Sequence, residues 1–150
     1  KGGVLHGESV PRIAFLREII EQVPGDGLSP IAPLRFSEFT SAEEMRAYMS
    51  DTTQPREFKY AGAEVLRGNP MNLVAGGHSG KDYYLLYFGI HQPRRRTFSL
   101  PEGSFRVDII DTWNMKIEEV SSCASGTVTV ELPVRPYMAV RIVRTAPAET

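Results

Sequence analysis

One short segment, 110–115, gathers three side chains that could bind a sugar. Trp113 is the only tryptophan of the chain, and Asp111 and Asn114 flank it. An indole face can stack on a sugar ring while a carboxylate and an amide bond its hydroxyls. The same residue types also close turns through their own side chains, with the ring sealing the end of a domain. We expect the structural role, in which Asp111 and Asn114 close a turn and the Trp113 ring is mostly buried. The alternative is a carbohydrate-binding site formed by Trp113, Asp111 and Asn114.

Acid–base hydrolysis of a glycoside would require two carboxyl groups that face each other across the bond. Glu118 and Glu119 are neighbours on a predicted strand, so their side chains point to opposite faces. Asp108 and Asp111 lie three residues apart on another strand and diverge in the same way. A long-range pair such as Glu8 with Asp111 stays open. These strands therefore predict no complete catalytic pair.

Metal and cofactor chemistry has little support in the sequence. The three histidines are His6, His78 and His91, and none has a second ligand at the spacing of a helical metal motif. The single cysteine, Cys123, rules out an intrachain disulfide and a cysteine-based zinc site. We therefore expect no metal and no cofactor. The thiol count slightly favours a cytoplasmic setting and leaves export open.

Charge and hydropathy exclude two classes of partner. Lys and Arg total 17 against 18 Asp and Glu, so no basic surplus exists for nucleic acid. Arg94, Arg95 and Arg96 form the only dense basic cluster, which is typical of a solvated edge. The longest apolar run, 83–88, is far shorter than a membrane span. Neither nucleic acid nor a membrane is an expected partner, and the start at Lys1-Gly2-Gly3 suggests a segment of a longer polypeptide.

The first part of the chain, 1–71, is predicted to be helical. Ser9 is a suitable cap and Pro11 fits the first turn of a helix over residues 9–23. Apolar residues recur along it at helical spacing, at Ile13, Leu16, Ile19, Ile20 and Val23. Residues 41–50 fit a second short helix. The Pro- and Gly-rich stretch 24–33 is predicted to be a connector without regular structure.

The second part, 72–150, is predicted to be an antiparallel β-sandwich, which makes the chain mainly β with an N-terminal α-helical segment packed against it. The expected strands are 82–88, 96–100, 105–111, 116–121, 127–132 and 138–144, and the glycine-rich stretch 76–80 is expected to be a hairpin loop. The strands 105–111 and 127–132 alternate apolar and polar residues, whereas 82–88 is apolar on both faces and requires a second covering layer. The expected shared core contains Leu85, Val107, Ile109, Val130 and Ile142.

Several motifs carry a resemblance to a known group of enzymes. Residues 2–9 and 12–17 resemble the end of the TIM-like catalytic barrel in bacterial glycoside hydrolases. The motifs at 83–89, 100–103, 107–115 and 135–137 are similar to the β-sandwich domain of unknown function that closes those enzymes. The resemblance covers residues 1 to about 24 and about 72 to 145.

The resemblance implies that the catalytic carboxylates lie upstream of Lys1, and that His6 and Glu8 line the rim of the active site in the parent protein. It names the upstream barrel of the same polypeptide as the partner of this chain. Three functions follow as alternatives: an accessory domain that packs on and stabilises the barrel, a carbohydrate-binding module that uses Trp113 and exposed aromatic residues, and an autonomous enzyme. Fold alone does not choose between them.

Overall fold

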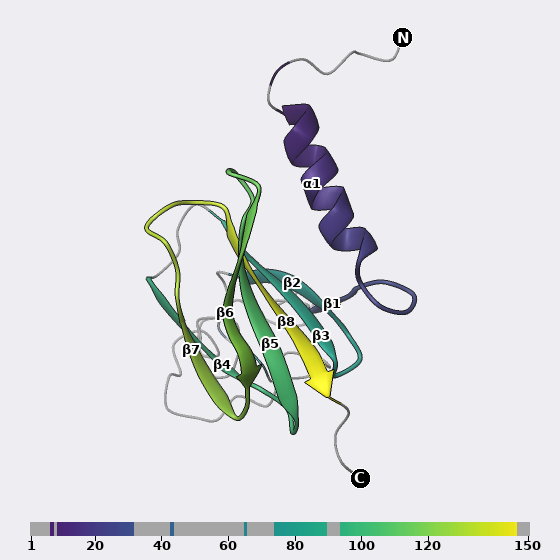
Figure 1. Ribbon diagram of the computed structural model, residues 1–150, viewed down its shortest axis with the longest axis vertical. Helices are drawn as coiled ribbons and strands as arrows, with labels where there is room; N and C mark the ends of the chain where they lie inside the picture. Colours follow the sequence, from purple (N-terminus) through teal and green to yellow (C-terminus); the bar gives the residue numbers. More distant parts are fainter. Residues whose placement is uncertain are drawn as a thin grey trace.

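The described residues form an antiparallel β-sandwich with one helix against its outer face (Figure 1). The computed structural model describes residues 7, 9–31, 43, 65, 74–89 and 94–146. The elements are α1 (Ser9–Glu21), β1 (Ser29–Ile31), β2 (Val74–Ser79), β3 (Tyr83–Phe88), β4 (Arg95–Ser99), β5 (Ser104–Asp111), β6 (Lys116–Ala124), β7 (Thr127–Glu131) and β8 (Met138–Ala146). All but Glu43 of the second predicted helix lies outside the described residues.

Two sheets face each other across the main core. The larger has the strand order β1-β2-β3-β8-β5-β6, and the smaller pairs β4 with β7. Every pairing is antiparallel. Phe88 of the large sheet lies 6.4 Å from Phe98 of the small sheet, measured between ring centroids, and this contact joins the layers. The mainly β class and the six strands predicted from the sequence are therefore confirmed.

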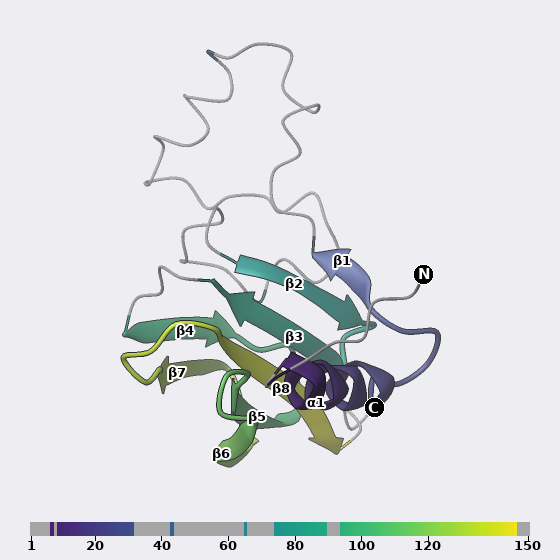
Figure 2. The same ribbon diagram turned by 90° about the horizontal axis from the view of Figure 1, so that it is seen from above.

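The strand β3 contacts a second layer on each of its two faces, although Tyr87 stays 39% exposed. Its residues Tyr84, Leu86 and Phe88 enter the core between the sheets. Leu85 points the other way and packs beside Ile19 of α1. Figure 2 shows α1 on the face of the large sheet opposite β4 and β7. The predicted second layer is confirmed.

The predicted core is confirmed for four of its five members. Val107, Ile109, Val130 and Ile142 are buried between the sheets. The placement of Leu85 in that core is wrong, because its side chain lies on the helix-facing side. Alternation separates the two faces of a strand but does not say which face meets which layer.

Two strands were not predicted. The stretch expected to be a hairpin loop forms β2, and part of the expected connector forms β1. A Cβ at Gly76 would come within 2.7 Å of the Leu85 carbonyl oxygen, and one at Gly77 within 2.9 Å of the Leu28 Cβ. These glycines allow neighbouring chains to approach closely, which is a reason for glycine inside a strand. No helix among the described residues has the length and apolar character needed to span a membrane.

A buried polar cluster fixes the end of α1 to the sheet. Arg141 donates to the Asp108 carboxylate from Nε at 2.8 Å and from its NH2 nitrogen at 2.7 Å, and both side chains are buried. Arg141 also donates to the Gln22 side-chain oxygen at 3.1 Å. Burial raises the pKa of the neighbouring Tyr83 hydroxyl, with Arg141 opposing the effect. The helix therefore has a defined position on the sandwich.

Candidate functional site

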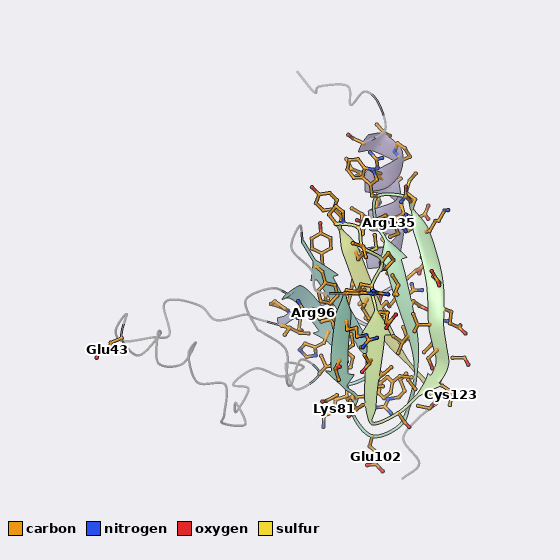
Figure 3. The ribbon with its side chains drawn as sticks, turned by 90° about the vertical axis from the view of Figure 1, so that its left-hand side faces the viewer. Glu43, Lys81, Arg96, Glu102, Cys123 and Arg135 are labelled. Carbon is orange, nitrogen blue, oxygen red and sulfur yellow. The ribbon has the colours of Figure 1, made fainter. Side chains whose placement is uncertain are left out.

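The most distinctive polar and aromatic cluster lies at the end of the large sheet where β5 turns into β6. We call this cluster the aromatic corner. Its members come from α1, from the β5–β6 turn and from the segment before β8, and they are Arg12, Asp111, Trp113, Asn114, Arg135 and Tyr137. Figure 3 labels Arg135 at one end of the strands.

Asp111 organises the turn through its buried carboxylate. Its Oδ1 accepts hydrogen bonds from the backbone N–H of Trp113 at 3.1 Å and of Asn114 at 2.9 Å. Its Oδ2 accepts from the Asn114 side-chain amide at 2.8 Å and pairs with Arg135 at 2.9 Å. This arrangement confirms that Asp111 closes the turn through the backbone. The Asn114 side chain was expected to do the same, but it bonds to the carboxylate of Asp111 instead.

The electrostatics of Asp111 favour the ionised form. Burial alone would raise its pKa. The hydrogen bonds from Asn114, the charge of Arg135 and the N–H of Trp113 outweigh burial, and the pKa of Asp111 lies below its ordinary value. Asp111 is therefore a fixed anion at neutral pH and has no proton to donate.

Trp113 is 52% exposed, so the expectation that its ring is mostly buried is wrong. The ring is nevertheless held in place. The Arg12 guanidinium lies 3.7 Å from its centroid, and the Arg12 Nε donates to the Trp113 carbonyl oxygen at 3.0 Å. Tyr137 stacks beside the indole with 5.8 Å between ring centroids. The corner therefore presents an aromatic side chain that is both accessible and preorganised.

Two residues at the corner have left-handed backbone conformations that are uncommon outside glycine. Met115 has a φ of 55° and Tyr137 a φ of 67°. Tyr137 is held in place by its backbone, because its carbonyl oxygen accepts from the Thr112 hydroxyl at 2.5 Å and its N–H donates to the Gly89 carbonyl oxygen at 3.3 Å. Backbone strain of this kind concentrates at functional sites.

The structure brings together the three candidate residues of the 110–115 segment, and it adds three that sequence reasoning missed. Arg12 lies 101 residues before Trp113, so no local pattern links them. Arg135 and Tyr137 precede β8 in a proline-containing segment. His6 and Glu8 lie outside the described residues.

Outside the corner, the carboxylates considered for catalysis lie on β5 and β6, where Asp108 is opposite Glu119. Asp108 is bound to Arg141 in the buried cluster. Glu118 and Glu119 lie on the exposed strand β6, where neighbouring side chains point to opposite faces. Within the described parts of the chain, no group of three or more His, Cys, Asp or Glu side chains is placed to hold a metal ion.

The fold and the corner define a β-sandwich domain with an exposed aromatic site at one end. The family described as a domain of unknown function (DUF5605) matches residues 72–143. A comparison with curated proteins found no match.

Two solved structures are similar to the chain. One is a candidate glycoside hydrolase from Bacteroides vulgatus ATCC 8482, with 26% identity and a TM-score of 0.55, covering 97% of this chain and 25% of that chain. The other is called a glycoside hydrolase, with 11% identity and a TM-score of 0.51, covering 89% of this chain and 25% of that chain. The second likeness concerns the fold alone. The chain thus spans a quarter of the length of each of these proteins.

Proposed function

We propose that this chain is a non-catalytic, C-terminal accessory domain of a glycoside hydrolase, which packs on the catalytic domain and stabilises it. The proposal rests on the difference between the share of this chain and the share of the similar protein that the two have in common. Nearly the whole chain, 97%, matches one quarter of a candidate glycoside hydrolase at 26% identity. A unit that corresponds to a quarter of a larger enzyme is most simply one of its domains.

The state of the carboxylates supports a non-catalytic role. A glycosidase needs a general acid, whose pKa is usually raised so that it holds a proton near neutral pH. Asp111 has a lowered pKa and is engaged by four donor groups. Asp108 is a partner in a buried ion pair. Both carboxylates therefore serve the structure of the domain.

Hydrolysis of aryl glycosides tests the proposal. The 150-residue chain is assayed beside the longer polypeptide that contains it, with the same panel of substrates. We expect turnover from the longer polypeptide and none from the chain alone. Turnover by the chain alone that Asp111→Asn abolishes, while Glu118→Gln leaves it unchanged, would overturn the proposal.

The exposure of Trp113 favours carbohydrate binding as a second candidate function. Trp113 is 52% exposed although Arg12 and Tyr137 contact its ring, and the Arg135 side chain at the same corner is 53% exposed. An exposed indole and a guanidinium can contact the apolar surface and the hydroxyl groups of a sugar. Titration of the chain with oligosaccharides, followed by Trp113 fluorescence, tests this function. Binding that Trp113→Ala removes and Val134→Ala retains supports a binding module, because Val134 is an exposed apolar residue of the loop before β8. Equal binding by both variants would locate any sugar site away from the corner.

A further inference from the structure

The apolar surface of α1 is wider than the surface that the sandwich covers. Phe15 and Ile19, one helical turn apart, pack against the large sheet, and Ile19 is only 3% exposed. On the neighbouring side of the helix, Ile13, Leu16 and Ile20 are 51%, 41% and 51% exposed. Their spacing of three and then four residues aligns them along one face. We call these three residues the α1 stripe.

The remaining side of α1 is mainly polar, with the 45% exposed Val10 as an apolar exception, so the stripe is not simply the solvent face of the helix. Glu18 and Glu21 are exposed, and Arg17 donates to Glu21 at 2.6 Å. A helix that faces water on one side and a sheet on the other usually has apolar residues only toward the sheet. The α1 stripe is an additional apolar face, and such faces mark interaction surfaces.

The stripe is held in a fixed orientation. Gln22 accepts from Arg141 just beyond the C-terminal end of α1, and Arg12 bonds to Trp113 near the N-terminal end. Figures 1 and 3 show the N-terminal part of α1 extending past the end of the sheet, where no strand covers it. A partner would therefore meet a rigid ridge and would not need to order it first.

We propose that the α1 stripe is the docking face for the catalytic domain of the same polypeptide, an inference that rests on the proposed function. Three quarters of the similar protein from Bacteroides vulgatus lie outside the part that this chain matches, so an occupant of domain size is available. The stripe belongs to α1, the first helix or strand among the described residues, and the proposed function places the catalytic domain before it in the polypeptide. An apolar ridge at a domain junction fits a partner with a complementary apolar groove.

Paired variants test the docking face. The stripe variant is Ile13→Gln/Ile20→Gln, and the control is Ala14→Gln/Glu18→Gln on the polar side of α1. In the 150-residue chain, each variant should change the melting temperature by at most about 2 °C, because the replaced side chains are exposed. A larger loss in the stripe variant alone would show that the stripe supports the sandwich itself, which would overturn the inference.

The longer polypeptide supplies the decisive comparison. Amide hydrogen exchange in residues 9–21 should be at least about tenfold slower there than in the isolated chain. The stripe variant should remove this protection, and the control should keep it. Equal exchange in both proteins, or retained protection in the stripe variant, would overturn the inference. So would a dimer of the isolated chain that the stripe variant dissociates and that persists in the longer polypeptide.

The activity and hydrogen-exchange results distinguish a failure of the docking face from a failure of the proposed function. A longer polypeptide that hydrolyses glycosides but leaves the α1 stripe unprotected contradicts the docking face alone. A protected stripe in a longer polypeptide that has no catalytic domain contradicts the proposed function and, with it, the identity of the occupant.

Discussion

Replacing Asp111 with asparagine tests the interpretation of the aromatic corner. The substitution keeps an oxygen for the two backbone donors at residues 113 and 114. It also turns an amide toward the Asn114 side chain and Arg135, so that donor faces donor. A hydrogen bond to a charged group contributes about 1.5–3 kcal/mol, and Arg135 is 53% exposed and contributes less. We therefore expect Asp111→Asn to lower the free energy of unfolding by about 2–4 kcal/mol.

The pH dependence of this effect has a definite sign. The pKa of Asp111 is lowered in the folded state, so its ionised form stabilises the fold above the unfolded pKa of about 3.9. This contribution is lost as pH falls through the lower folded pKa. The difference between the wild-type chain and Asp111→Asn should therefore be constant above about pH 5 and shrink below about pH 4.

Urea unfolding followed by fluorescence gives a direct assay, because the only tryptophan lies within the corner. Far-UV circular dichroism should give the same midpoint if the corner unfolds with the whole domain. Glu118→Gln is the control, since Glu118 is exposed on β6 and its loss should change stability by less than about 0.5 kcal/mol. If Asp111→Asn also changes the free energy of unfolding by less than about 0.5 kcal/mol, and leaves its pH dependence unchanged, the reasoning is refuted.

Three further predictions concern the two sides of the large sheet. Ile19→Ala should cost about 2–4 kcal/mol in urea unfolding, because Ile19 is the buried contact of α1; a change below about 1 kcal/mol would mean that the helix is not docked. Arg141→Met should cost about 3–5 kcal/mol, because it leaves the buried Asp108 carboxylate with only the longer contact from Arg106, at 3.3 Å. Asp108→Leu/Arg141→Met should recover most of this loss, and equal losses in the two variants would contradict the buried pair. Arg96→Met should raise the melting temperature by a few degrees, because two guanidinium nitrogens of this buried side chain have no partner among the described residues. A lower melting temperature would indicate that Arg96 has an anionic partner.

The strands were predictable where side chains alternate or form an apolar run, and unpredictable where glycine replaces the pattern. Phe105, Val107 and Ile109 alternate with polar residues, which identifies β5 without a structure. Residues 76 and 77 carry no side chains from which a period could be detected, although close packing explains both glycines. A three-residue strand such as β1 is too short for a period and forms because β2 is beside it.

The site was predictable in its residue types and unpredictable in its exposure. Asp111 and Asn114 indicate a turn through local chemistry alone, and this turn is present. Whether Trp113 is buried depends on Arg12 and Tyr137, which reach it from distant parts of the chain. Such contacts depend on how the helix and strands pack, and no short stretch of the sequence indicates them.

Calorimetry of the longer polypeptide, with and without residues 9–146, tests the accessory role most directly. If this chain packs on and stabilises a catalytic domain, the truncated protein should unfold at a temperature at least about 5 °C lower and lose glycosidase activity faster on heating. A truncated protein with the same unfolding temperature and the same rate of inactivation would contradict the account.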